Sequence, residues 1–278
     1  MKKFLALAAA GMMAVTMTGC GNTAPKTTEE TSEKTAAAEL VELDNIVASG
    51  KLKIGYTLIN PLNYFDSETN EFVGFETEFA KAVCEKLGVT AEFQEIDWDS
   101  KEIELNSKNI DCIWNGMTIT PEREENMSIS IPYMENRQVL VVRSADKDKY
   151  TNSVEGANVV AEQGSAGEEL VQADESFASA KYTAVASQAT ALMEVSSGTA
   201  DVAVIDYTMA GGSVGEGTDY ADLVVVDKNY ESESYGIAFR KGSDVTETVN
   251  GIIKELASEG TLATIAQKYG LTDLILVK

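Results

Sequence analysis

The spacing of hydrophobic residues predicts an alternating series of strands and helices in the first half of the chain. Residues 52–56 have the apolar character of a short buried strand, and residues 89–93 alternate like a second one. Between residues 75 and 87, apolar side chains recur at every fourth position, which is typical of an amphipathic helix, and Gly88 is placed to end it. A third apolar run, 110–114, predicts another strand. This order predicts parallel strands with helices on both faces of the sheet.

A second series follows, and three helix starts are signalled along the chain. Ser165 and Glu168 have the spacing of a capping box, and Thr120-Pro121 begins a helix in the first series in a comparable way. Near the end of the chain, Asp244 and Glu247 are expected to cap a helix that is followed by a last one over 261–269. The second series is expected to contain a helix at 187–197 and strands at 138–143, 157–161, 181–185, 201–205, 223–226 and 235–239. The whole pattern predicts an α/β fold with two lobes.

The N-terminus has a different character from the rest of the chain. Lys2 and Lys3 precede an apolar run over 4–15, which is too short to span a membrane and is typical of a secretory leader. The run ends in Met17-Thr18-Gly19-Cys20, which resembles the lipobox of bacterial lipoproteins, with Met17 where leucine is usual. An ordinary leader with an incidental cysteine is the alternative. We expect a signal peptide over 1–19, lipidated Cys20, and a disordered tether over 20–39 that is too polar to form a core.

Composition removes several classes of function. The 278 residues include 22 basic and 45 acidic side chains and no histidine, so the formal net charge is −23. Serine–histidine–aspartate hydrolysis and histidine-ligated zinc are therefore excluded, and a nucleic-acid partner is disfavoured because phosphates require clustered Lys and Arg. Cys84 and Cys112 match no metal motif; an extracytoplasmic disulfide is conceivable, but two buried free thiols fit their apolar surroundings better. We expect no metal and no cofactor.

Eight segments, taken together in order and spacing, resemble family 3 of the extracellular solute-binding proteins, the amino-acid receptors of ABC uptake transporters. They are VGFETEFAKAVCEKLGV (73–89), QEIDWDS (94–100), SKNIDCIWNGMTITPERE (107–124), PYMENRQVLVV (132–142), EQGSAG (162–167), GTADVAVID (198–206), YGIAFRKG (235–242) and EGTLATIAQKYG (259–270). The resemblance implies a type II periplasmic-binding clamshell, with one lobe over 40–134 plus 236–278 and the other over 137–232. Two crossover segments, near 133–137 and 231–235, would form the hinge.

The resemblance also implies a site for a free amino acid. Arg123 would bind its α-carboxylate through two parallel hydrogen bonds, together with the start of the helix at Ser165 and Ala166. Asp206, at the end of an apolar strand, would accept from its ammonium group, and Trp98 would stack on its side chain. Ordinary structural roles remain open for each: a surface ion pair for Arg123, a helix cap for Asp206 and core packing for Trp98. The full expected set is Tyr56, Asn60, Trp98, Asn115, Gly116, Thr118, Arg123, Ser165, Ala166 and Asp206.

The first loop departs from the family pattern, because the usual acid and aromatic residue before Pro61 are missing. Tyr56, Asn60 or Asn63 could take their place, and a polar neutral amino acid is the preferred ligand. The expected function is therefore capture of an amino acid outside the cytoplasm and its delivery to ABC permease subunits, by a monomer that is anchored through lipid and is not an enzyme. Two alternatives remain: a dehydratase on the same fold, with Asp206, Glu162 or Tyr56 as acid or base, and a sensory component that presents a ligand.

Overall fold

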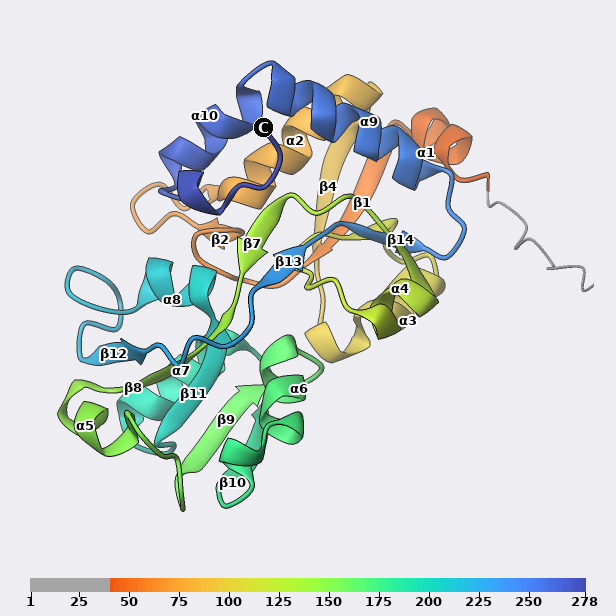
Figure 1. Ribbon diagram of the computed structural model, residues 1–278. Helices are drawn as coiled ribbons and strands as arrows, with labels where there is room; N and C mark the ends of the chain where they lie inside the picture. The colour runs from red at the N-terminus through yellow and green to blue at the C-terminus, as the bar shows by residue number, and fades with distance from the viewer. Residues whose placement is uncertain (1–40) are drawn as a thin grey trace, which may run out of the picture. The chain divides into compact units, whose positions relative to one another are not determined.

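The computed structural model describes residues 41–278, which form two five-stranded sheets with helices packed around them (Figure 1). The leader, Cys20 and the tether predicted for residues 1–39 lie outside the described residues. The first sheet has the order β4 (Thr90–Glu95), β1 (Lys51–Tyr56), β5 (Cys112–Ile113), β14 (Ala238–Arg240) and β6 (Met127–Ile129). The second has the order β10 (Lys181–Val185), β9 (Asn158–Glu162), β11 (Val202–Asp206), β8 (Gln138–Arg143) and β12 (Leu223–Val226). The predicted α/β class is confirmed.

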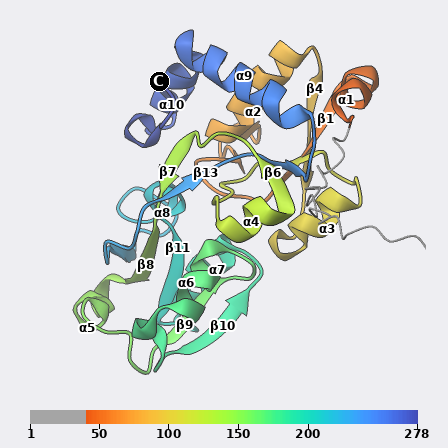
Figure 2. The same ribbon diagram turned by 45° about the vertical axis from the view of Figure 1, so that its right-hand side comes forward.

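The helices divide between the two sheets. Below, the first half is the first sheet with the helices packed on it, and the second half is the second sheet with its helices. In the first half, α2 packs against β4 and against α9 and α10 from the end of the chain, and these helices lie together in Figures 1 and 2. In the second, α6 and α7 both pack against β9 and β11. The helices are α1 (Leu43–Ser49), α2 (Phe75–Leu87), α3 (Lys101–Asn106), α4 (Pro121–Asn126), α5 (Lys147–Tyr150), α6 (Ala166–Ala173), α7 (Gln188–Ser197), α8 (Tyr207–Ser213), α9 (Val245–Ser258) and α10 (Thr261–Lys268). No helix among residues 41–278 is long and apolar enough to cross a membrane.

The chain passes between the sheets twice, and the two passages pair with each other. The first is β7 (Met134–Asn136) and the second is β13 (Glu233–Tyr235), and they form an antiparallel two-stranded ribbon. A further short pair, β2 (Tyr64–Phe65) with β3 (Phe72–Val73), lies before α2. The single strand predicted over 235–239 is therefore wrong, since this stretch is divided between β13 and β14.

The parallel pairing predicted for the first series is confirmed for β1, β4 and β5, but both sheets are mixed because they also contain antiparallel strands. β1 pairs in parallel with β4 and β5, and β9 with β10 and β11. By contrast, β8 runs antiparallel to β11, and β14 runs antiparallel to β5. The reason is the edge at which the chain enters each sheet. Each of these two strands follows a passage directly and enters its sheet at the edge where the parallel strands end, as the pairing of Gln138 with Asp206 shows.

Of the three helix signals in the sequence, those at Thr120 and Ser165 are confirmed and that at Asp244 fails, while Ser187 caps a further helix. The hydroxyls of Thr120, Ser165 and Ser187 each accept from the amide three residues further on. Asp244 does not cap its own helix: its Oδ1 accepts from the amides of Glu42 and Leu43, at 2.8 and 3.1 Å. This carboxylate therefore caps the start of α1, a helix that the sequence pattern did not predict.

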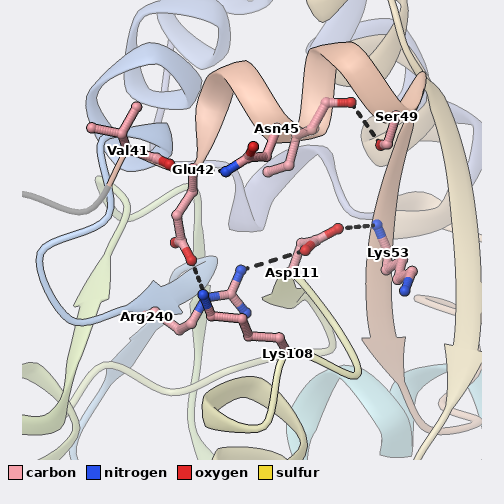
Figure 3. Close-up of a pocket in the computed structure, with 9 residues that line it drawn as sticks. Val41, Glu42, Asn45, Ser49, Lys53, Lys108, Asp111 and Arg240 are labelled. Carbon is pink, nitrogen blue, oxygen red and sulfur yellow. Dashed lines mark hydrogen bonds and ion pairs between the residues drawn. The ribbon is translucent and has the colours of Figure 1, made fainter.

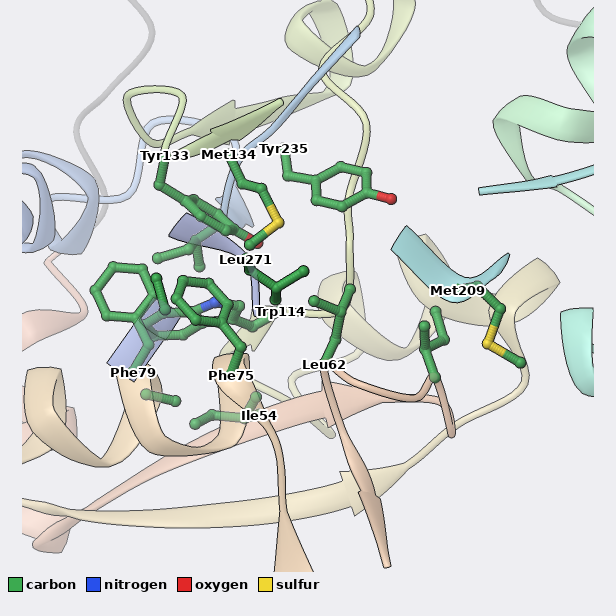
Figure 4. Packing of buried hydrophobic residues seen from close by; sticks show 14 of the residues in the cluster. Ile54, Leu62, Phe75, Phe79, Trp114, Tyr133, Met134, Met209, Tyr235 and Leu271 are labelled. Carbon is green, nitrogen blue, oxygen red and sulfur yellow. The ribbon is translucent and has the colours of Figure 1, made fainter. Parts of the chain in front are cut away.

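The core of the first half is rich in aromatic side chains (Figure 4). Phe79 meets Trp114 edge-on at 5.0 Å between ring centroids and Tyr133 at 5.5 Å. Trp114 is 1% exposed and lies in the core. Cys84 and Cys112 are buried free thiols, as expected.

A buried carboxylate lies beside this aromatic core. Glu76, in the first turn of α2, accepts from the Tyr133 hydroxyl, from the Gly116 amide at 2.9 Å and from Asn63 Nδ2 at 2.8 Å. Asn63 also donates to Asn115 Oδ1 at 3.0 Å, so the network reaches the loop after β5. Burial raises the pKa of Glu76 to about 7, and these hydrogen bonds oppose the shift only in part.

The raised pKa of Glu76 predicts a specific pH dependence of stability. Between pH 4.5 and 7 the folded protein holds a proton that the unfolded chain has released, so the free energy of unfolding falls as pH rises through this window. In Glu76→Gln this contribution is absent, while other acids contribute equally to both proteins. Urea denaturation at pH 5 and pH 8 should therefore show the wild type losing about 1–3 kcal/mol relative to the variant. A difference that does not change with pH would contradict the assignment.

Candidate ligand-binding site

A small cavity of about 10 Å³ lies where elements of the two sheets meet. The carboxyl ends of parallel strands are the edge of an α/β sheet at which ligands bind. β11 ends at this cavity with Asp206 and β9 with Glu162, and the loop after β5 approaches it from the first sheet. Its lining residues are Ile59, Trp98, Asn115, Gly116, Thr118, Arg123, Glu162, Ser165, Ala166, Gln188 and Asp206. Eight of the ten side chains predicted from the sequence thus line one cavity.

Arg123 reaches across the boundary between the two halves. It lies in α4, one turn after the Thr120 cap, and is 4% exposed. Its Nη1 donates to the Thr118 carbonyl at 2.9 Å, on the side of the first sheet. Its Nη2 donates to the Gly164 carbonyl at 3.3 Å and pairs with Glu169 Oε1 at 2.6 Å, both on the side of the second sheet. The guanidinium is therefore a buried cation with one partner that is open to solvent, because the Glu169 side chain is 53% exposed.

Asp206 is the anionic counterpart and is held by three side-chain amides. Its Oδ1 accepts from Asn136 Nδ2 at 2.8 Å and from Gln138 Nε2 at 2.6 Å, and its Oδ2 accepts from Gln188 Nε2. Burial raises its pKa, while these hydrogen bonds oppose the shift. The amides fix the position of the carboxylate without neutralising its charge. It can therefore pair with a cation that enters the cavity.

The loop after β5 is fixed from behind by polar contacts. Asn115 Nδ2 donates to Thr57 Oγ1 at 2.6 Å, and the Gly116 amide donates to Glu76. Gly116 has φ +57°, and a Cβ at this position would lie 3.2 Å from the ring of Tyr235. Glycine is therefore favoured here for its conformation and for the close packing. The loop presents its backbone at the cavity with little freedom to move.

Trp98 and the start of α6 complete the wall. Trp98 is nearly buried, and Lys101 Nζ lies 4.9 Å from its ring centroid. Lys101 donates to the carbonyls of Trp98 at 3.2 Å and Gly164 at 2.9 Å, which adds a second contact between the halves. Ser165 Oγ accepts from the Glu168 amide, and the Glu168 carboxylate accepts from the Gly164 amide. The capping box is thus present, with its return bond one residue earlier than predicted.

Two predicted residues do not line this cavity. Tyr56 ends β1 and packs its ring 4.6 Å from Phe72 and 6.1 Å from Phe93, in an aromatic cluster. Asn60 Nδ2 donates to the Gly212 carbonyl at 2.9 Å, a contact between the two halves. Their roles in ligand binding remain predictions.

Three lining residues were absent from the predicted set: Ile59, Glu162 and Gln188. Glu162 had been considered only as an acid for a catalytic alternative. It ends β9 at the same sheet edge as Asp206, so its position at the end of an apolar strand was a usable signal. Gln188 follows a helix cap, and its orientation depends on the tertiary contact with Asp206.

A larger cavity, of about 250 Å³, lies under α1 and has a structural explanation (Figure 3). Arg240 pairs there with Glu42 and Asp111, and its Nη1 donates to the carbonyls of Leu105 and Ile110 at 2.8 and 2.7 Å. The charge of this arginine is already matched by protein groups. The small cavity between the halves is therefore the stronger candidate for a ligand.

The chain is similar to several known proteins. The arginine-binding extracellular protein ArtP of Bacillus subtilis is 28% identical over 273 residues, which cover 97% of this chain and 98% of that protein. A mutant of ArgBP from T. maritima superposes with a TM-score of 0.76 at 30% identity, covering 83% of this chain and 99% of that one. The ancestral amino-acid-binding protein AncCDT-1, described as a precursor of cyclohexadienyl dehydratase, superposes with a TM-score of 0.72 at 32% identity, covering 82% and 98%.

The solved structures have the type II periplasmic-binding fold, so the predicted clamshell with two crossover segments is confirmed. The model of the bacterial extracellular solute-binding proteins, family 3, matches residues 52–272. The chain therefore belongs to family 3 of the bacterial extracellular solute-binding proteins.

Proposed function

We propose that this protein captures a free α-amino acid between two lobes and delivers it to the permease subunits of an ABC importer. The observation that carries the proposal is that Arg123 and Asp206 line one cavity from opposite sides. A zwitterion needs both a cation and an anion once its own charges lose water. ArtP is named as an arginine-binding extracellular protein, which supports the same class of ligand.

The proposed lobes are 40–134 plus 236–278 and 137–232, with β7 and β13 as the hinge. The cavity of about 10 Å³ has room for about one water molecule, so an amino acid enters only when the lobes separate. On closure, the ligand carboxylate takes the place of Glu169 at Arg123 Nη2. The ligand then contacts both lobes and supplies the differential affinity that favours the closed form.

The protein is proposed to bind its ligand without transforming it. ArtP and ArgBP are named as binding proteins, and AncCDT-1 as amino-acid-binding although it is a precursor of a dehydratase. Asp206 is held in place by amide donors, as a binding anion should be. Incubation with prephenate or arogenate should therefore leave both compounds unchanged; turnover would favour the dehydratase alternative.

Removing either charge should abolish amino-acid binding. In Arg123→Ala or Asp206→Asn, one charge of the ligand is buried without its partner, so we expect affinity to fall about 100-fold or more. Calorimetric titration of the purified full-length chain with a panel of amino acids provides the measurement. Lys254→Ala, which removes an exposed cation of α9, should leave affinity unchanged. Wild-type affinity in either site variant would refute the proposed role.

The protein is also proposed to be anchored outside the cytoplasm through lipid on Cys20, after removal of residues 1–19. The lipobox-like sequence supports this, and membership of an extracellular family supports the location. Cys20→Ala should move the protein from the membrane fraction to the soluble fraction, as followed by immunoblotting of fractionated cells. Cys84→Ala is the matched control and should leave it in the membrane fraction. A membrane-bound Cys20→Ala protein would contradict the lipid anchor.

A further inference from the structure

The cavity contains one carboxylate more than the main chain of an amino acid requires. Arg123 is assigned to the ligand carboxylate and Asp206 to its ammonium group. Glu162 is the third charged side chain in the wall, and neither assignment uses it. With Arg123 and Asp206 matched by the ligand's own charges, the lining keeps a net acidic group. A ligand with an additional positive charge would balance it.

Glu162 is buried, and one of its carboxyl oxygens lacks a hydrogen-bond donor in the described part of the chain. It is 2% exposed at the end of β9, and its Oε1 has no hydrogen-bond partner among the described residues. Lys101, whose positive charge opposes the burial that raises the pKa of Glu162, donates to the carbonyls of Trp98 and Gly164. Burying a carboxyl oxygen without a partner is costly, and such groups in native proteins are nearly always satisfied. A donor on the ligand side chain supplies the missing partner.

A second, independent feature is the groove beside the cavity. It has a volume of about 610 Å³ and shares Thr118 and Ala166 with the cavity. Its lining contains four acids and no Lys or Arg: Glu169, Asp174, Glu231 and Glu233. A cleft lined by one sign of charge concentrates ions of the opposite sign, and the chain as a whole carries −23. The approach to the cavity therefore favours a cationic ligand.

We propose that Glu162 receives the cationic side-chain group of the ligand, so that the protein selects basic amino acids such as arginine or lysine. This inference rests on the proposed function and names its ligand class. It replaces the preference for a polar neutral ligand, which was based on the amides and hydroxyls alone. A neutral amide would satisfy the hydrogen bond of Oε1 but would form no ion pair with Glu162.

A cationic ligand group beside Glu162 changes the protonation of this carboxyl. Burial, with a further contribution from Asp206, raises the pKa of Glu162 to about 8, while Lys101 opposes the shift. At pH 7 this carboxyl therefore holds a proton in most molecules. A cation placed against it favours the ionised form, so binding of a basic amino acid releases up to about one proton to the buffer. A neutral amino acid releases much less.

The test is calorimetric titration of the full-length chain at pH 7 with L-arginine, L-lysine and L-glutamine, in two buffers of different ionisation enthalpy. In the wild type we expect a basic amino acid to bind at least about 10-fold more tightly than glutamine and to release protons. In Glu162→Gln we expect its affinity to fall about 10- to 100-fold and the proton release to disappear. Glu155→Gln, an exposed acid before β9, should behave as the wild type.

The outcomes separate this inference from the function on which it rests. If glutamine or another neutral amino acid binds the wild type as tightly as arginine and lysine, the inference is overturned and the amino-acid-binding function stands. Undiminished affinity of Glu162→Gln for the basic ligand overturns it equally. If no amino acid binds the wild type, the proposed function itself fails. Since wild-type selectivity is measured without any variant, the result does not depend on how well Glu162→Gln folds.

Discussion

The guanidinium of Arg123 is the contact on which the arrangement of the two halves depends. It is a buried cation, and a buried cation must be matched by acceptors on all sides. One side is matched by the carbonyl of Thr118, next to the first sheet, and the other by Gly164 and Glu169, next to the second. Two of these acceptors are rigid backbone groups, whereas Glu169 is a half-exposed side chain. Under the proposed function, a ligand would replace Glu169 at Arg123 without unfolding either half.

The second anchor of the site is connected to the passages between the sheets. Asn136 in β7 and Gln138 at the start of β8 donate to Asp206, and both also donate to Glu233 in β13, at 2.5 and 2.8 Å. Burial raises the pKa of Glu233 to about 7, and Asp206 contributes to the shift. Two acids thus share two amide donors at the base of the clamshell. A change in the charge around Asp206 therefore acts on hydrogen bonds that involve both passages.

Much of this arrangement could be predicted from local signals. Helix caps at Thr120 and Ser165 specify backbone geometry within four residues, and they were found where the pattern indicated. The site was predicted through the ends of apolar strands and through resemblance to a family. Glu162 also lies at the end of an apolar strand, as Asp206 does, but it was not predicted to bind the ligand. Nothing in its neighbourhood in the sequence reveals that it is buried.

Features that depend on contacts distant in sequence could not be predicted. The direction of β8 and β14 is set by the side from which the chain enters each sheet, and no periodicity encodes that. Asp244 has the sequence environment of an N-cap for α9, yet it caps α1, some 200 residues away. Tyr56 and Asn60 lie in the expected loop, but aromatic packing and the Gly212 carbonyl determine where their side chains point.

The ribbon formed by β7 and β13 has a mechanical consequence. Two separate linkers would let the halves twist, slide and tilt independently. Because these strands are hydrogen-bonded side by side, from Met134 with Tyr235 to Asn136 with Glu233, they resist shear and bend as one strip. The halves are thereby limited to little more than a single rotational degree of freedom. In the proposed opening and closing of the lobes, such a strip would return Arg123 and Asp206 to the same facing positions, with the same spacing between the two charges.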